Sequence, residues 1–262
     1  MTVEGNQSSF AICPDAYDLS GPRLYNKSNF RENPLDPARI LRFAPKVKTS
    51  YADVEGDFSG AQEIFTNLAK FSIEIPDFTI CEVTIDGKEY FVQDTERING
   101  VAPVSLLREV ARGKVDPRTK QYLAAGTSQL CSSLTRYLTD RVGSSRPFLS
   151  EIYRLEEQYL LVEDHMVLVD IDPIVETLDI TQPSSQVIFL SHYLGDIAGM
   201  INSAELHLEV SFEQARNDVV RSILELGISL EALQKNSSTP LSILLEKYSK
   251  SKGTQWIDAL AK

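Results

Sequence analysis

Two short apolar runs separated by a polar turn lie past the middle of the chain. The runs are Tyr159–Val162 and Met166–Val169, and residues 163–165 between them are polar or charged. Short runs rich in aliphatic and β-branched residues, joined by a polar turn, are typical of a β-hairpin. The pattern therefore predicts two buried antiparallel strands.

Polar side chains stand at the open end of this predicted hairpin. Gln158 precedes the first strand, Asp170 and Asp172 follow the second, and Pro173 ends it because proline cannot donate to the ladder. Hard cations such as Mg²⁺ prefer oxygen ligands arranged in this way. We interpret Asp170, Asp172 and Gln158 as candidate metal ligands; the simpler alternative is that the acids only cap a turn.

Residues 38–100 alternate apolar runs with turn residues. Asp86-Gly87 lies between two of the runs and is a strong hairpin signal. Strands are predicted over 38–43, 78–85 and 89–93, and a helix over 61–71. This region is therefore predicted to be a small sheet with one helix.

Beyond residue 100 the apolar spacing becomes helical. Pro117–Val142 is the longest such stretch, and Asp116 and Pro117 suit its cap and first turn. Further helices are predicted over 104–111, 186–203, 212–226 and 241–248, with a last short helix around Trp256.

The change of pattern predicts an α+β protein in three parts. Residues 1–37 are polar and rich in Ser, Asn, Pro and Asp, which indicates a loosely structured arm with at most one short strand. A β-rich domain over 38–100 and a mainly helical domain over 101–262 follow.

The net charge of the chain limits the classes of partner that it is expected to bind. It has 26 basic and 37 acidic residues among 262, and a net charge of −11. Proteins that bind nucleic acids or anionic membranes need clustered Lys and Arg, so neither partner is expected. A small phosphorylated ligand held in a local basic pocket is compatible with the net negative charge. No apolar run approaches the roughly 20 residues that span a bilayer, and no signal-peptide pattern opens the chain. A cytoplasmic protein is the expectation.

The three cysteines are far apart in the sequence. Cys13, Cys81 and Cys131 show neither zinc-ligand spacing nor a disulfide framework. This pattern predicts free thiols in a reducing compartment.

The predicted order of elements over residues 38–180 resembles the protein-kinase-like fold, especially its small aminoglycoside and choline phosphotransferases. Ile40-Leu41-Arg42-Phe43 is similar to the strand that carries the family's phosphate-contacting lysine, here Arg42. Glu63, followed downstream by Ile75-Pro76, resembles the family's glutamate-bearing helix. The resemblance implies that Arg42 and Glu63 form a pair beside the phosphates.

Two further matches concern the nucleotide and the metal. Tyr90–Gly100 resembles the strand and hinge that hold adenine, which implies nucleotide contacts from Gln93, Thr95 and Glu96. Leu168-Val169-Asp170 resembles the strand with the metal-binding aspartate, and the long helix over 117–142 resembles the one before the catalytic loop.

The resemblance implies a bilobal fold and phosphoryl transfer. A small antiparallel β-sheet lobe with one helix would face a mainly helical lobe with a hairpin, with ATP and Mg²⁺ between them. The acceptor would be a hydroxyl or amine on a small molecule or a protein.

The chain departs from the family around the phosphates. No glycine-rich loop precedes Arg42, and arginine is bulkier than lysine and always charged, so the replacement is not conservative. Lys46 or Lys48 could supply the cation instead.

A second departure concerns the catalytic base. If Gln158-Tyr-Leu-Leu takes the place of the family's Asn-Ile-Leu-Leu, Tyr153 occupies the position of the catalytic aspartate. A tyrosine cannot accept a proton at neutral pH. Glu151 is the best nearby candidate for the base, with Glu156 and Glu157 as alternatives, and Arg42 is the second catalytic candidate.

These departures leave two hypotheses. One is a divergent phosphotransferase with relocated parts. The other is a pseudokinase, in which the fold is kept for binding a protein partner through the acidic surface or the helices over 186–262.

Overall fold

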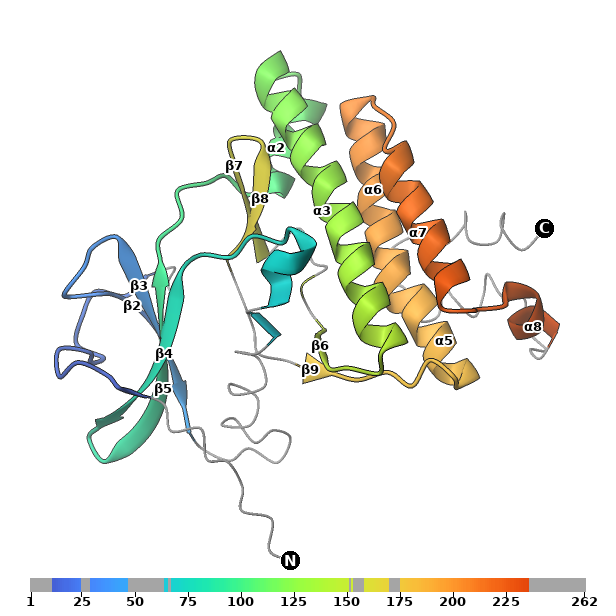
Figure 1. Ribbon diagram of the computed structural model, residues 1–262. Coiled ribbons are helices and arrows are strands. Elements are labelled where there is room, and N and C mark those ends of the chain that lie inside the picture. The colour runs from blue at the N-terminus through green and yellow to red at the C-terminus, as the bar shows by residue number, and fades with distance from the viewer. Residues whose placement is uncertain are drawn as a thin grey trace, which may run out of the picture. The chain divides into compact units, whose positions relative to one another are not determined.

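The computed structural model of the chain describes residues 11–24, 29–46, 64, 65, 67–150, 152, 158–169 and 175–235 (Figure 1). They form an α+β fold of two compact units. The sheet unit holds the described residues up to 46 together with Pro76–Ile98. The helical unit holds the described residues of 64–75 and those from Asn99 onward.

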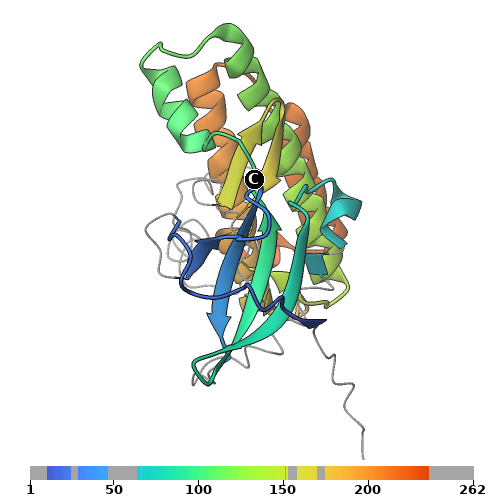
Figure 2. The same cartoon turned by 90° about the vertical axis from the view of Figure 1, so that its left-hand side faces the viewer.

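The sheet unit is built on a five-stranded sheet, visible face-on in Figure 2. Its order is β1 (Ala11–Ile12), β4 (Phe78–Ile85), β5 (Lys88–Glu96), β3 (Arg39–Pro45) and β2 (Phe30–Glu32). Strands β3, β4 and β5 pair antiparallel, as predicted. The N-terminal arm, expected to hold one short strand, supplies two: β2 pairs antiparallel with β3, and β1 runs parallel to β4. The sheet is therefore mixed, because a short segment of the N-terminal arm adds to its edge.

The hairpin of β4 and β5 confirms the turn predicted from Asp86-Gly87. Both turn residues have positive φ, 50° and 74°, and Ile85 pairs with Lys88 across them. Positive φ at both central positions is the geometry of a type I′ turn, which asparagine, aspartate and glycine favour.

Side-chain alternation gives the sheet two apolar faces. On one face Leu41, Phe43 and Val92 are fully buried. On the other face Phe91 and Ile80 are buried and pack against partly buried residues of β3 and β4. Arg42 and Gln93 belong to this second face, since Arg42 lies two residues from Ala44 on β3 and Gln93 two residues from Phe91 on β5.

A disulfide joins Cys13 to Cys81. Their Cα atoms are 5.1 Å apart, within the usual range for such a bond. The parallel pairing of Ile12 with Glu82 brings together the two cysteines, which are 68 positions apart, and sequence spacing cannot show this. The prediction of three free thiols is therefore wrong; only Cys131 is free and buried. With one disulfide and one free thiol, the cysteines no longer indicate a reducing compartment.

The helical unit is organised around α3 (Pro117–Gly143) (Figure 1). This helix packs against α6 (Gly195–Leu208), α7 (Glu213–Glu225) and the hairpin of β7 (Tyr159–Val162) and β8 (His165–Leu168). The remaining elements are η1 (Ala69–Phe71), α2 (Pro103–Ala111), β6 (Phe148–Leu149), β9 (Val175–Glu176), α5 (Pro183–Ile188), the π-helical η2 (Phe189–Leu194) and α8 (Leu230–Lys235). Strands β6 and β9 pair antiparallel.

The start of α3 follows its sequence signals. Asp116 Oδ1 accepts hydrogen bonds from the backbone N–H groups of Arg118 and Thr119, both at 3.0 Å. Pro117 occupies the first turn, where its missing N–H costs nothing. No helix in the described part of the chain is both long and apolar enough to cross a membrane.

The segment before β4 packs with the helices, although its sequence pattern places it, as a helix, in the β-rich domain. The ring of Phe71 meets that of Tyr137 on α3 edge-on, with centroids 5.5 Å apart. Glu74 forms a parallel β-bridge with Val167 on β8. These contacts attach the segment to α3 and the hairpin.

Candidate functional site

The β7–β8 hairpin positions the first candidate, Gln158. Tyr159 pairs with Leu168, and the Val169 N–H donates to the Gln158 carbonyl at 2.7 Å. Gln158 therefore lies opposite Val169, the residue that directly precedes Asp170. The register brings one predicted metal ligand beside the chain position of another.

The side chain of Gln158 is buried, and its oxygen has no hydrogen-bond partner among the described residues. The residue is 4% exposed, and Oε1 accepts no hydrogen bond from the described residues. A buried amide oxygen left unpaired costs roughly 1–3 kcal/mol. An amide oxygen is also a good ligand for Mg²⁺. A bound cation or donor would therefore satisfy an atom that the described residues leave unsatisfied.

Two glycines let neighbouring segments approach the hairpin closely. A Cβ added at Gly100 would lie 2.8 Å from Leu160 Cβ, and one at Gly126 would lie 3.2 Å from the Asp164 carbonyl. Val101, next to Gly100, forms a β-bridge with Leu161. The hairpin is thus held tightly on both sides, which fixes Gln158 at its end.

The aromatic residue after Gln158 anchors the same strand. The hydroxyl of Tyr159 donates to the Ile152 carbonyl at 2.5 Å, and the side chain is fully buried. Burial raises the pKa of Tyr159 well above its usual value. Tyr159 therefore stays neutral and has a structural role.

Several predicted residues lie outside the described residues. These are Glu63, Lys48, Glu151, Tyr153, Glu156, Glu157, Asp170 and Asp172. Among the described residues, no group of three His, Cys, Asp or Glu side chains could hold a metal ion. Asp170 and Asp172 remain predicted ligands on the strength of the sequence.

In the sheet unit, the strand register brings Arg42 and Gln93 together. Arg42 on β3 lies directly opposite Gln93 on β5 and opposite Phe30 on β2. Its guanidinium carbon is 5.5 Å from the centre of the Phe30 ring, a cation–π contact. Gln93 is 6% exposed.

The other two hinge candidates lie further along β5. Thr95 pairs with Ile40, and Glu96 pairs with Arg39 at the end of the strand. Thr95 lies on the same face as Gln93, whereas Glu96 points to the opposite face because strand side chains alternate. Three of the four sheet candidates therefore share a face: Arg42, Gln93 and Thr95.

Lys46, the alternative cation, has partners of its own. Its ammonium group pairs with Glu82 at 2.8 Å and lies 4.6 Å from the centre of the Phe91 ring. An ammonium group held by both a carboxylate and an aromatic ring is positioned for packing on the sheet face.

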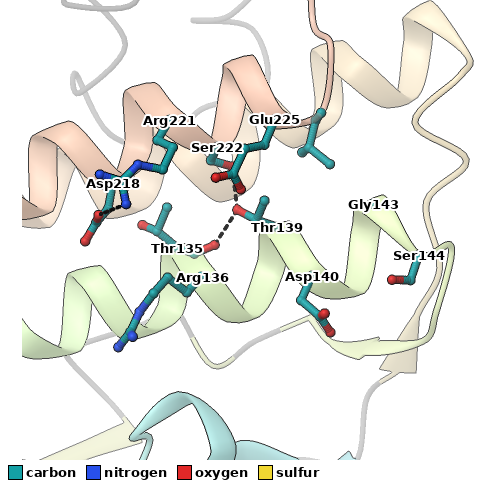
Figure 3. Close-up of a pocket in the computed structure, with 11 residues that line it drawn as sticks. Thr135, Arg136, Thr139, Asp140, Gly143, Ser144, Asp218, Arg221, Ser222 and Glu225 are labelled. Carbon is teal, nitrogen blue, oxygen red and sulfur yellow. Dashed lines mark hydrogen bonds and ion pairs between the residues drawn. The ribbon is translucent and has the colours of Figure 1, made fainter.

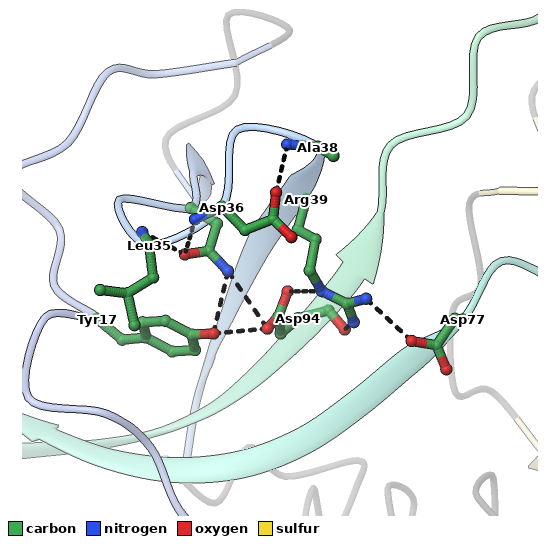
Figure 4. A network of polar contacts seen from close by, with 8 residues as sticks. Tyr17, Leu35, Asp36, Ala38, Arg39, Asp77 and Asp94 are labelled. Carbon is green, nitrogen blue, oxygen red and sulfur yellow. Dashed lines mark hydrogen bonds and ion pairs between the residues drawn. The ribbon is translucent and has the colours of Figure 1, made fainter.

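A polar network that the sequence pattern does not indicate is centred on Asp94 (Figure 4). Asp94 Oδ2 accepts hydrogen bonds from the Tyr17 hydroxyl at 2.5 Å and from Asn33 Nδ2 at 3.3 Å. Asp94 Oδ1 accepts from Arg39 Nε at 2.8 Å, and Arg39 also pairs with Asp77 at 2.9 Å. The network ties the N-terminal arm to β3 and β5.

This network perturbs the titration of its members. Burial, followed by the hydrogen bond to Asp94, raises the pKa of Tyr17 to about 12. Burial alone would lower the pKa of Arg39, but its hydrogen bonds to Asp94 and Asp77 outweigh that effect and raise it. Every polar group in the network has a partner, so its role is structural.

A pocket of about 430 Å³ lies between α3 and α7 (Figure 3). The Thr139 and Ser222 hydroxyls join the two helices at 2.6 Å within it. Asp218, 7% exposed, accepts a hydrogen bond from Gln214 and lies 3.7 Å from Arg221. The buried polar groups on its wall are paired with one another, so the described contacts explain the pocket as a helix–helix contact.

Comparisons with known proteins give this chain no family. No family model matches it, and no curated protein matches its sequence. A solved structure described as WaaP in complex with acyl carrier protein is 11% identical, with 74% of this chain and 80% of that chain covered and a TM-score of 0.36. A TM-score this low supports no conclusion about fold or function.

Proposed function

We propose that the chain is a divergent kinase-like protein that binds ATP and Mg²⁺ and transfers a phosphoryl group to a small-molecule or protein acceptor. The observation that carries the proposal is Gln158. Its buried oxygen has no described partner, and its strand register sets it beside the residue preceding Asp170. Unsatisfied buried oxygens next to a carboxylate are features of a cation site.

The order of elements supports the same proposal. The strand with Arg42, the β4–β5 hairpin, the long α3 and the β7–β8 hairpin follow one another as the resemblance requires. The sheet unit therefore contains the strands that carry Arg42 and Gln93, and the helical unit contains the hairpin that follows Gln158.

Each candidate residue has a distinct task in this proposal. Asp170, Asp172 and Gln158 would hold Mg²⁺, which offsets the charge of the phosphates when it is bound. Arg42, paired with Glu63, would contact the phosphate oxygens. Gln93, Thr95 and Glu96 would contact the nucleoside.

The transfer step assigns Glu151 as the base. The acceptor oxygen or nitrogen forms a bond to the γ-phosphorus while the bond to the β–γ bridging oxygen breaks and ADP leaves. The proton of the acceptor passes to the Glu151 carboxylate. Arg42 would stabilise the charge that develops on the phosphate oxygens.

Calorimetric titration with Mg²⁺ and ATP tests the proposal. We expect the wild type to bind, and Asp170→Ala and Gln158→Leu each to weaken binding at least tenfold. Asp164→Ala is the matched control, because this exposed acid lies in the turn at the opposite end of the same hairpin. The absence of binding to the wild type, or an equal loss with Asp164→Ala, would contradict the proposal.

A second candidate function is a non-catalytic binding module on the same scaffold. It is favoured by Lys46, which is engaged by Glu82 and Phe91 and so does not replace the missing lysine. Tyr153 in the position of the catalytic base points the same way. Turnover of ATP that disappears in Asp170→Ala would exclude this candidate, whereas nucleotide binding without turnover would support it.

A further inference from the structure

A second pocket of the helical unit lies between α2 and α6, with a volume of about 410 Å³. Val104, Leu107 and Ala111 on α2 give it an apolar wall. Leu107 is buried, and Val104 is half-buried. This volume falls in the range of sites for small molecules, roughly 300–1,000 Å³.

The charged side chains on the wall of this pocket are all basic. They are Arg108 on α2 and Arg112, which directly follows the end of that helix; His207 on α6 lines the same pocket. This is unusual in a chain with a net charge of −11. The pocket is therefore a local basic site on an acidic protein.

The two arginines differ in how they are engaged. Arg112 pairs with Glu109 on its own helix at 2.6 Å. Arg108 is exposed and makes no hydrogen bond or ion pair with the described residues. Its guanidinium group has five donors available for a ligand.

His207 adds a further nitrogen on the facing helix. Its Nδ1 lies 2.7 Å from the Ser203 carbonyl, and a carbonyl only accepts, so Nδ1 carries a hydrogen. That hydrogen bond fixes the orientation of the imidazole ring and does not involve Nε2.

We propose that the α2–α6 pocket binds a small organic anion with a short apolar group. The anionic head, a carboxylate or a phosphate monoester, is held by Arg108 and Arg112, since a guanidinium fork matches both groups. The apolar group lies on Val104 and Leu107. The alternative is that these basic residues only offset the negative ends of α2 and α6, near which they lie.

Titration with phenyl phosphate in the absence of ATP and Mg²⁺ tests this proposal. We expect the amide signals of α2 and α6 to shift in NMR spectra, and Arg108→Glu to weaken binding at least tenfold. Inorganic phosphate, which lacks the apolar group, is expected to bind more weakly than phenyl phosphate.

Two variants serve as controls. Arg136→Glu changes an exposed arginine of α3 that is outside this pocket, and it should leave the affinity unchanged. Asp170→Ala should also leave it unchanged, which separates this pocket from the proposed nucleotide site. No binding to the wild type, or an equal loss with Arg136→Glu, would overturn the proposal and leave only the helix-end role.

Discussion

Two polar side chains, Asp94 in the sheet unit and Gln158 in the helical unit, are similarly buried but differ in their hydrogen bonds. Asp94 is 7% exposed and Gln158 is 4% exposed. Both oxygens of Asp94 accept hydrogen bonds from described side chains, whereas Oε1 of Gln158 accepts none.

The difference separates polar groups kept for structure from those kept for function. A buried carboxylate with a full set of donors is explained by the fold itself, because the network joins the N-terminal arm to two strands. A buried amide oxygen without a donor is not explained by stability, since it costs free energy. Residues of the second kind are the better guides to a ligand site.

Asp94→Ala should produce the largest loss of stability in this comparison. It leaves the buried Tyr17 hydroxyl without its acceptor and leaves half-buried Arg39 with Asp77 alone, and breaking a buried charged pair costs about 3 kcal/mol. Urea unfolding followed by circular dichroism would measure the loss. Glu89→Gln, an exposed acid on the same strand, is the control and should change the free energy of unfolding by less than about 0.5 kcal/mol. A loss as small as that of the control would show that the network is not structural.

Gln158→Leu should have the opposite sign. Leucine removes the oxygen that lacks a described partner and replaces the amide with an apolar side chain of similar size. The free energy of unfolding should therefore rise by about 1 kcal/mol. Thermal unfolding without ligand would measure this gain. A destabilised variant would indicate that Gln158 has a structural partner, and the comparison with Asp94 would then fail.

The smallest effect concerns Glu205, a satisfied carboxylate in the helical unit. Hydrogen bonds from Arg216 and from the Phe212 N–H lower the pKa of Glu205, despite its partial burial. A lowered pKa in the folded state gives stability above the unfolded pKa that is lost as the pH falls through the folded value. Glu205→Gln should therefore cost at most about 1 kcal/mol at pH 7 and less near pH 3.

Unfolding curves of wild type and Glu205→Gln at the two pH values would check this effect. Glu225→Gln, an exposed glutamate on α7, provides the control. If the cost of Glu205→Gln were independent of pH, the ion pair would contribute nothing through its charge.

Local signals predicted the elements whose structure they determine directly. Asp86-Gly87 specified a tight hairpin, and Asp116-Pro117 specified the start of α3. The apolar runs around residues 163–165 specified β7 and β8. Each of these depends on contacts between residues near one another in the sequence.

Long-range pairing could not be predicted in the same way. The parallel pairing of β1 with β4 brings together Cys13 and Cys81, which form a disulfide although they are 68 residues apart. The pattern also places the helix over 61–71 in the β-rich domain, although Phe71 packs on Tyr137 of α3. Nothing local in these sequences specifies the partner.

The candidate site was predictable to the extent that it follows a hairpin. Gln158 is indicated by its place before an apolar strand, and the structure adds that its oxygen has no partner among the described residues. Asp94 was missed, although it shares a strand phase with Val92, where an apolar residue is expected. An acid at an apolar position of a strand is the signal that could have identified Asp94. The partners of Asp94 depend on the strand register, which the sequence does not show.

The bond between Cys13 and Cys81 closes the intervening backbone into a covalent ring. A single proteolytic cut anywhere between residues 14 and 80 would open this ring without separating the chain into two molecules. Both fragments would migrate as one species until a reducing agent is added. The integrity of purified protein must therefore be judged under reducing conditions, since an unreduced sample conceals such a cut.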